Sequence, residues 1–410
     1  MAGLKTRNEI RFMLNGEHVA LTKVAPDETL LDWLRLERSL RGTKEGCAEG
    51  DCGACTVLVG RLSAGRLVYE SVNACIRFLG SLDGTHIVTV EHLRGDGDRL
   101  HPVQQAMVDF HASQCGFCTP GFVMSLYALW MRSPEPSDAA IEKALQGNLC
   151  RCTGYEAIVR AARAISSYGK AAKDPLAAER KAIAEKLAAM KDGARIEIGA
   201  GNQRLMVPAN ADDLAAVLDK EPGATIVAGS TDVGLWVTKH MRDIAPAIFI
   251  GNLDGLCGIS EDKGVISIGA GVTYTEAFST LAKRVPALGP LFDRIGGDQV
   301  RRGNKRRTIP LEDFFIAYGK QDRQPGEFVE AVHVPVPDRD TKFAVYKITK
   351  RRDEDITAAL GAFLLTLARD GTVAEVRIAY GGMAATPKRA FGVEKALLGK
   401  PWTEATVEAA

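Results

Sequence analysis

The chain has 410 residues, of which 46% are hydrophobic and 25% charged, and its formal net charge is +1. This composition predicts a globular protein of two to four domains, and the small net charge argues against nucleic acid or a membrane surface as a partner. Because the N-terminus lacks a signal-peptide core and no run of about 18 apolar residues exists, we expect a cytoplasmic protein without a membrane span.

The nine cysteines are unevenly distributed. In a reducing cytosol, clustered cysteines indicate metal binding or catalysis rather than disulfides. We interpret the isolated Cys257 as a small buried apolar side chain. The other eight form two groups of four: Cys47, Cys52, Cys55 and Cys75, then Cys115, Cys118, Cys150 and Cys152.

The first predicted domain covers residues 1–92. Residues 8–24 have the pattern of a β-hairpin that turns at Asn15-Gly16, and Pro26 to Thr29 open a short helix. Short strands follow the cysteine loop at 56–60, 66–72 and 85–93. We therefore expect a small sheet with one helix packed on it.

The first cysteine group has the spacing C-x4-C-x2-C with a fourth cysteine 20 residues later. This is the plant-type [2Fe–2S] ligand pattern, in which four thiolates hold two adjacent irons. Glycines at 46, 50 and 53 permit the positive φ angles and close approach that such a loop needs. Zinc is the alternative, but only Cys52 and Cys55 form a C-x2-C pair, and the absence of histidine from the group argues against a Rieske centre.

Residues 93–168 predict a helical [2Fe–2S] domain. Four segments, 101–113, 120–132, 138–146 and 155–168, have apolar residues at helical spacing. Cys118 and Cys152 each precede a helix, and we expect Thr119 and Thr153 to cap the two helices, so that two helix N-termini point at one anionic centre. The spacing alone leaves zinc open, but the first group favours a second [2Fe–2S] cluster.

Residues 169–193 are rich in Ala, Lys and Glu and predict an exposed, partly helical linker. An α/β pattern follows over 194–335, and strands dominate over 336–410. Within 225–233 a strand leads through small residues into a helix, which suits a pyrophosphate. The stretch is not G-x-G-x-x-G, and many strand–helix turns look alike, so this pattern alone does not identify a site.

Three stretches together resemble the molybdenum hydroxylase family: TKEGCAEGDCGACTV (43–57), RLHPVQQAMVDFHASQCGFCTPGF (99–122) and GNLCRCTGY (147–155). The segments YGKQDRQPGEFVEAV and YGGMAATPKRA are similar to the xanthine dehydrogenase branch. The resemblance implies an α+β multidomain fold. Its parts are a plant-ferredoxin-like β-grasp domain, a four-helix [2Fe–2S] domain, an α/β FAD-binding domain of the vanillyl-alcohol-oxidase/CO-dehydrogenase-flavoprotein type, and an incomplete C-terminal α/β segment.

The same resemblance implies the function of an iron–sulfur and flavin subunit. Electrons from xanthine or hypoxanthine oxidation at a molybdenum–pterin centre, on a large partner subunit, would pass through the helical-domain cluster, the ferredoxin-type cluster and FAD to NAD⁺. Two small and two large chains would form a heterotetramer, and no residue of this chain would perform the hydroxylation. Gln114 would lie against the pterin, Cys152 would be the ligand nearest to it, and the loop 349–357 would lie beside the flavin ring. The implied FAD contacts are Ile226, Val227, Ala228, Gly229, Ser230, Thr231, Asp232, Val233, Val329 and Lys347.

The sequence departs from the family's pattern in two places. Gln299-Val300-Arg301 runs directly into RGNKRRTIPLEDFF, so that a second flavin motif of several tens of residues is missing near 301–303, and the chain ends at TVEAA, before the family's last α/β segment. Either these parts are deleted or the natural chain is longer. The alternatives are therefore another molybdenum hydroxylase that acts on aldehydes or N-heterocycles, a flavin-free electron carrier, and a zinc-stapled interaction module.

Overall fold

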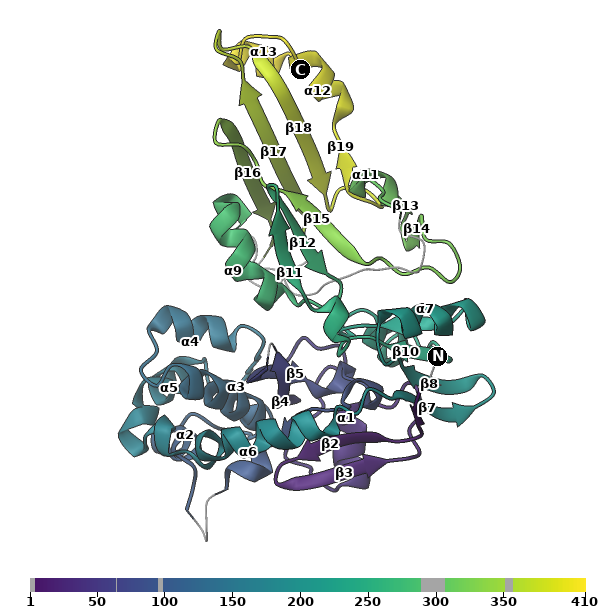
Figure 1. The fold of residues 1–410 in the computed structure, drawn as a ribbon. Helices are drawn as coiled ribbons and strands as arrows, with labels where there is room; N and C mark the ends of the chain where they lie inside the picture. The colour runs from purple at the N-terminus through teal and green to yellow at the C-terminus, as the bar shows by residue number, and fades with distance from the viewer. Residues whose placement is uncertain (1–3, 64, 95–98, 289–306, 351–356) are drawn as a thin grey trace. The chain divides into compact units, whose positions relative to one another are not determined.

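The computed structural model describes residues 4–63, 65–94, 99–288, 307–350 and 357–410 (Figure 1). The chain divides into two compact units, which are described separately. The first comprises Met1–Leu214 and Gly223–Leu253, and the second comprises Ala215–Pro222 and Asp254–Ala410. In the described ranges, none of the helices has the length and apolarity that a bilayer crossing requires.

The N-terminal domain is a five-stranded sheet of order β3-β2-β6-β4-β5. Its hairpin turns at Asn15, whose φ of 55° confirms the Asn-Gly turn prediction. Thr29 caps the short helix that follows, and Leu30, Leu31 and Leu34 bury its apolar face against the sheet. The elements are β2 (Ile10–Leu14), β3 (Glu17–Leu21), α1 (Leu30–Asp32), η1 (Trp33–Glu37), β4 (Thr56–Ser63), β5 (Arg66–Asn73), η2 (Ala74–Ile76), η3 (Leu79–Ser81), β6 (His86–Val88) and η4 (Val90–Leu93).

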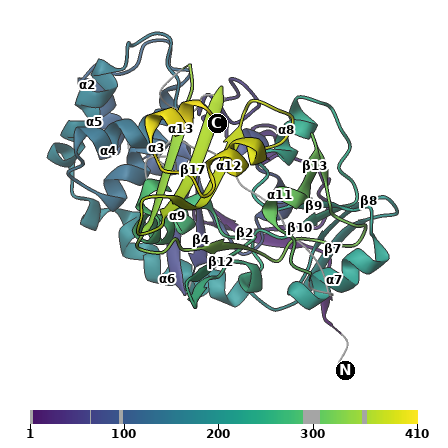
Figure 2. The same cartoon turned by 90° about the horizontal axis from the view of Figure 1, so that it is seen from above.

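The second domain contains the four predicted helices. They are α2 (Pro102–Asp109), α3 (Thr119–Arg132), α4 (Asp138–Leu145) and α5 (Glu156–Tyr168). Phe122, Tyr127 and Trp130 bury the apolar face of α3, the most buried of the four. Figures 1 and 2 both show these helices on one side of the ferredoxin-like sheet. On its other side lie the strands β7 (Arg195–Ala200), β8 (Gln203–Val207) and β10 (Ala247–Phe249).

The segment 169–193 was expected to be an exposed, partly helical linker; the helix is confirmed, but the expected exposure is wrong. After η5 (Ala171–Lys173), residues Pro175–Met190 form the helix α6, which packs on β2, β4 and β5 (Figure 1). Leu176, Ile183, Leu187 and Met190 are buried in the same core as α2–α5. At the start of α6, Asp174 accepts hydrogen bonds from the Tyr127 hydroxyl and from His101 Nε2, at 2.7 and 2.9 Å.

A second sheet, of order β1-β7-β8-β10-β9, completes the first unit. The N-terminal strand β1 pairs with β7 across almost two hundred residues of sequence, so the chain's start joins the predicted flavin domain. Phe249 of this sheet packs edge-on against Phe78 of the ferredoxin-like domain, with ring centroids 6.3 Å apart. The elements are β1 (Thr6–Arg7), β7 (Arg195–Ala200), β8 (Gln203–Val207), β9 (Thr225–Val227), α8 (Val233–Thr238) and β10 (Ala247–Phe249). Helix α7 (Ala211–Lys220) begins in this unit and continues into the second from Ala215 on.

The second unit is built mainly from antiparallel strands. Helix α9 covers the sheet β11-β12-β15 around a small core of Ile266, Val272, Ala277 and Leu281. Helix α12 packs on β18 of the sheet β16-β17-β18-β19. The predicted flavin domain over 194–335 is therefore divided between the two units. The elements are η6 (Asp254–Leu256), β11 (Ile259–Asp262), β12 (Val265–Gly269), α9 (Tyr274–Arg284), η7 (Pro286–Leu288), α11 (Leu311–Phe314), β13 (Phe315–Ala317), β14 (Lys320–Gln321), β15 (Ala331–Pro335), β16 (Thr341–Ile348), β17 (Ala359–Leu367), β18 (Val373–Gly381), β19 (Lys388–Arg389), α12 (Phe391–Leu397) and α13 (Glu404–Glu408).

Candidate metal and cofactor sites

The first four cysteines meet in two pairs. The thiols of Cys47 and Cys52 interact with each other, as do those of Cys55 and Cys75. The two pairs also lie close to each other, because Cys47 contributes to raising the pKa of Cys75 and Cys55 contributes to raising the pKa of Cys52. Cys55 and Cys75 are buried, whereas Cys47 and Cys52 are partly exposed. The structure thus brings together all four residues that the spacing selected.

In the loop that carries these thiols, two of the three glycines have the positive φ angles that the sequence predicted. Gly50 and Gly53 have φ of 78° and 66°, and the non-glycine Ala48 has φ of 55°. This turn directs the amide N–H groups of Glu49 and Cys52 toward the Cys47 sulfur, both at 3.4 Å. Gly46 serves a different need, because a Cβ at this position would lie 2.8 Å from the Cys52 sulfur.

Each pair in this group contains a thiol that resists ionisation. The hydrogen bond from Cys75 lowers the pKa of Cys55, while that same hydrogen bond, together with burial, raises the pKa of Cys75. Burial and the hydrogen bond with Cys47 raise the pKa of Cys52. Two adjacent thiolates repel each other, so a cationic centre is needed before all four ionise.

The second four cysteines also meet in pairs. The Cys152 thiol lies 3.6 Å from the Cys115 sulfur, and the thiols of Cys118 and Cys150 influence each other's ionisation. Burial and the Cys150 contact raise the pKa of Cys118 to about 12. Against the opposing effect of burial, the hydroxyl and amide of Thr153 lower the pKa of Cys150. The donor set of the second group therefore repeats that of the first.

The predicted helix caps in this group need correction. Helix α3 begins at Thr119 with Cys118 as its N-cap residue, so a presumed ligand and not Thr119 occupies that position. Helix α5 begins at Glu156 after Tyr155, whose φ is 70°. Thr153 lies before this turn and donates its hydroxyl to the Cys150 sulfur at 3.1 Å. The cysteine loop therefore determines where α5 begins, and local capping rules do not.

A donor set of paired thiols discriminates between the candidate metals. Throughout the described ranges, no three His, Cys, Asp or Glu side chains are grouped so as to hold a single metal ion. Structural zinc needs four ligands around one point. A two-iron cluster instead spreads four thiolates over two adjacent irons. The two pairs of thiols in each group match the ligand requirement of a [2Fe–2S] cluster.

The two cysteine groups are joined through the backbone. The amide of Leu149, next to Cys150, donates to the carbonyl oxygen of Cys52 at 2.9 Å. The buried Asn148 amide donates to the Gly53 carbonyl at 3.1 Å and accepts from the Ser125 hydroxyl at 2.6 Å. Our sequence reasoning did not identify Asn148 or Leu149, because nothing local indicates which residues contact a distant loop.

One end of the second group lies at the surface. Cys115, Cys152 and the predicted pterin neighbour Gln114 are all exposed. Phe117, Leu149 and Tyr155, close to these cysteines in the sequence, are large side chains that also remain between 38% and 46% exposed. The opposite pair, Cys118 and Cys150, is less exposed. The second group is thus open on the side of Cys115 and Cys152.

The predicted flavin stretch forms a tight turn between β9 and α8. Ser230 is fully buried with a φ of 68°, and its hydroxyl has no hydrogen-bond partner among the described residues. An added Cβ at Gly229 would meet no atom within 4 Å. A buried hydroxyl without a partner beside open space fits a bound polar group such as a nucleotide.

The remaining predicted flavin contacts lie elsewhere in the chain. Ile226 to Val233 belong to the first unit, whereas Val329 and Lys347, both partly buried, belong to the second. Residues 351–356 of the predicted ring-side loop lie outside the described residues. So does the position of the missing motif, near 301–303, which falls within 289–306.

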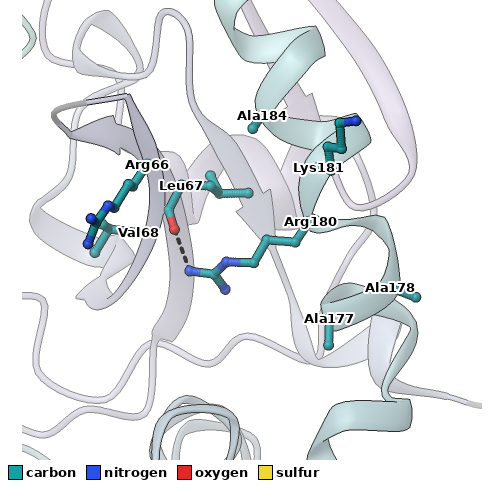
Figure 3. A pocket seen from close by; sticks show the side chains of 8 residues that line it. All are labelled: Arg66, Leu67, Val68, Ala177, Ala178, Arg180, Lys181 and Ala184. Atoms are coloured by element: carbon teal, nitrogen blue, oxygen red, sulfur yellow. Dashed lines mark hydrogen bonds between the residues drawn. The ribbon is translucent and has the colours of Figure 1, made fainter.

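A cavity of about 540 Å³ lies between β5 and α6, away from all these residues (Figure 3). The Arg180 guanidinium extends across it, donates to the Leu67 carbonyl and lies 5.6 Å from the centre of the Tyr69 ring. Arg180 thus anchors α6 to β5, and none of the predicted site residues lines this cavity.

Four family models match consecutive parts of the chain. Residues 12–76 match a 2Fe-2S iron-sulfur cluster binding domain, and residues 89–163 match a [2Fe-2S] binding domain. Residues 199–303 match an FAD binding domain in molybdopterin dehydrogenase, and residues 344–410 match a CO dehydrogenase flavoprotein C-terminal domain. Each cysteine group lies inside one iron–sulfur match, and residues 226–233 lie inside the FAD match.

Similar proteins extend this result. Xanthine dehydrogenase of Emericella nidulans is 30% identical over 97% of this chain and 36% of its own length. Aldehyde oxidase 2 of Macaca fascicularis is 28% identical over 98% of this chain and 36% of its own length. The crystal structure of quinoline 2-oxidoreductase from Pseudomonas putida 86 matches with 33% identity, covering 44% of this chain and 96% of that one, at a TM-score of 0.33. The chain thus spans about a third of the length of the curated relatives it matches.

Proposed function

Because the chain belongs to the molybdenum hydroxylase family, with two 2Fe–2S domains and an FAD-binding domain, we propose that it is the electron-transfer subunit of an NAD-dependent xanthine dehydrogenase. Electrons enter from a molybdenum–pterin centre on a large partner subunit and leave through FAD to NAD⁺, while xanthine or hypoxanthine is oxidised to urate. Two small and two large chains form the complex. This chain carries no residue for the hydroxylation itself.

The observation that supports this function most strongly is the direct backbone hydrogen bond between the two groups of four cysteines. Cys47 and Cys52 would hold one iron of the first cluster, and Cys55 and Cys75 the other. Cys115 with Cys152, and Cys118 with Cys150, would divide the second cluster in the same way. The hydrogen bond of 2.9 Å from the Leu149 amide to the Cys52 carbonyl links a neighbour of one ligand to a ligand of the other group.

The exposed end of the second group supports the direction of transfer. Gln114, Cys115 and Cys152 are open to the surface, so a partner that carries the pterin can approach them directly. The less exposed pair is Cys118 and Cys150, and Leu149, the neighbour of Cys150, contacts the first group. Electrons would therefore pass from the exposed cysteines to the buried ones and then across to Cys52.

Bound FAD would take up electrons from the first cluster and pass a hydride to NAD⁺. Residues 226–233 would hold it, and the unpartnered Ser230 hydroxyl would supply a hydrogen bond. Val329 and Lys347 would contribute contacts from the second unit. The alignment with the Emericella nidulans relative spans 487 residues, more than the 410 of this chain, so that relative carries segments without a counterpart here.

The substrate has a second candidate. Aldehyde oxidase 2 is 28% identical over 98% of the chain, and the xanthine dehydrogenase of Emericella nidulans is 30% identical over 97%. The two similarities are nearly equal, so an aldehyde is the second candidate substrate. Both belong to one reaction class, hydroxylation at molybdenum, and this chain would serve both in the same way. Purifying the large subunit that binds this chain and comparing xanthine with an aldehyde as reductant distinguishes them.

Addition of NADH to the purified chain with FAD tests the electron route. The proposed function predicts that NADH bleaches the flavin and cluster absorption together, because hydride enters at FAD and its electrons spread to the clusters. Dithionite bleaching without any response to NADH would instead support the flavin-free carrier, and a colourless zinc protein would exclude both.

A further inference from the structure

Lys239 connects the flavin stretch to the first cysteine group. It is the C-cap residue directly after α8 (Val233–Thr238), the short helix that follows residues 229–232. Figure 2 shows this helix. Its Nζ donates to the carbonyl oxygen of Cys47 at 2.5 Å and lies 3.4 Å from the carboxylate of Glu49. A cation from the flavin side therefore touches the backbone of a presumed cluster ligand.

The Lys239 contact stabilises a turn that places an N–H donor beside the Cys47 sulfur. Ala48 is in the left-handed region, with φ of 55°, which an L-residue adopts only at a cost. The same turn places the Glu49 amide 3.4 Å from the Cys47 sulfur. Lys239 binds both sides of Ala48, the Cys47 carbonyl and the Glu49 side chain, and so stabilises the conformation that supplies this N–H donor.

A second contact from α8 reaches the other end of the cysteine group. Gly234 packs on Ile76, the residue after Cys75, so closely that an added Cβ would lie 2.7 Å from the Ile76 Cβ. The helix therefore touches the chain beside the first and the last cysteine of the group. The position of Lys239 relative to these thiols follows from packing at both places and not from a single flexible side chain.

We propose that Lys239 tunes the redox potential of the first cluster, an inference that rests on the proposed function. Reduction adds one electron, and hence one negative charge, to a centre already surrounded by four thiolates. An ammonium at the Cys47 carbonyl stabilises that added charge and raises the potential. Glu49 opposes this effect in part. The electron comes from the second cluster and leaves to the flavin, and no bond or proton is transferred.

The expected change in redox potential is small, because solvent screens the charges of Lys239 and Glu49. The Lys239 side chain is 38% exposed and that of Glu49 is 43% exposed. We expect Lys239→Met to change the equilibrium constant for reduction by about threefold, which is about 28 mV for one electron. The effect should shrink as ionic strength rises, since the Debye length falls from about 30 Å at 0.01 M salt to about 3 Å at 1 M.

Redox titration of the purified, cluster-loaded chain, followed by electron paramagnetic resonance, tests this inference. Lys239→Met should lower the potential of one of the two cluster signals at low salt and leave the other unchanged. Lys239→Arg should keep the wild-type potential, and Glu49→Gln should raise it. Lys181→Met, at a side chain that is 90% exposed on α6, is the matched control and should change neither signal.

The outcomes separate this inference from the function on which it rests. A wild-type chain without two cluster signals contradicts the proposed function. Two intact signals with unchanged potentials in Lys239→Met overturn the role of Lys239 alone. If Lys239→Met fails to assemble the first cluster, Lys239→Gln decides, because its side-chain amide can still donate to the Cys47 carbonyl but carries no charge; an unchanged potential in that variant overturns the inference.

Discussion

At the residue scale, Gly53 lies where the backbones of the two iron–sulfur domains approach each other closely. Its φ is 66°, and a Cβ added there would lie 2.0 Å from the Gly147 carbonyl oxygen. Gly121 packs on the other side, with a virtual Cβ 2.1 Å from the Gly53 carbonyl oxygen. Glycine is thus required twice, for backbone conformation and for space, at a position between Cys52 and Cys55.

Gly53→Ala should separate these two requirements when it is compared with Gly84→Ala. Both glycines have nearly the same φ, 66° and 69°, but a Cβ at Gly84 would meet no atom within 4 Å. We expect Gly84→Ala to cost about 1 kcal/mol from backbone strain alone, and Gly53→Ala to cost about 3 kcal/mol or more. Urea unfolding followed by circular dichroism measures both. Equal midpoints would show that the contact with Gly147 is unimportant.

Substitution of single cysteines should remove one cluster at a time. Cys75→Ser removes a ligand from the first group and Cys152→Ser one from the second, and the two groups share no ligand. We expect each variant to lose one paramagnetic signal after reduction and to keep the other. Loss of both signals in either variant would contradict two independent ligand sets.

The residues with local sequence signals were the predictable ones. Spacing alone selected all eight paired cysteines, because the distances between the cysteines of each group can be read from the sequence. Lys239, Asn148 and Leu149 act on loops that are distant in sequence, and their residue types fit many ordinary roles. Only the folded chain shows what they contact.

At the scale of elements, α6 shows how composition misleads. Its many Ala, Lys and Glu residues suggested an exposed linker, but Leu176, Ile183, Leu187 and Met190 recur at helical spacing and are buried. In contrast, the hairpin at Asn15 and helices α2 to α5 were predicted, because turn residues and strong apolar periodicity are local. The β1–β7 pairing was not predicted, since it joins residues far apart in the sequence.

Leu187→Ala tests whether α6 belongs to the core. Leu187 is fully buried, so the truncation should cost 2 to 5 kcal/mol, on the order of other large-to-small core changes. Trypsin should then cleave within 169–193 faster than in the wild type. Glu185→Ala, at a side chain that is 69% exposed, is the control and should behave as the wild type does. Equal cleavage in both variants would favour the exposed linker.

His86 should make the ferredoxin-like domain sensitive to acid. Burial lowers its pKa to about 4, and the neutral ring donates from Nε2 to the Asn15 carbonyl and accepts at Nδ1 from the Tyr69 hydroxyl. Below pH 6.5 the unfolded chain binds a proton that the folded chain does not. The contribution of His86 to the free energy of unfolding is therefore fully present above pH 6.5, and it falls by about 3 kcal/mol as the pH drops to 4.

His86→Gln keeps a neutral donor and acceptor and removes this titration. Urea midpoints between pH 4 and 7.5 should therefore fall less steeply in the variant than in the wild type. Parallel pH profiles would contradict a neutral, buried His86.

At the scale of the whole molecule, the chain combines an N-terminal unit that holds both cysteine groups with a second unit that contains Val329 and Lys347, two of the predicted flavin contacts. The fold class followed from the sequence, because the cysteine spacings and the apolar periodicity are local signals. The division of residues 194–335 between the units did not follow, since it depends on contacts between distant strands.

The central claim is that paired thiols hold two iron clusters and not zinc. Metal and sulfide analysis of the purified chain, together with spin counting after full reduction, tests this claim most directly. Two [2Fe–2S] clusters require four irons, four acid-labile sulfides and two unpaired spins per chain. Two zinc ions per chain, with neither iron nor labile sulfide, would contradict it.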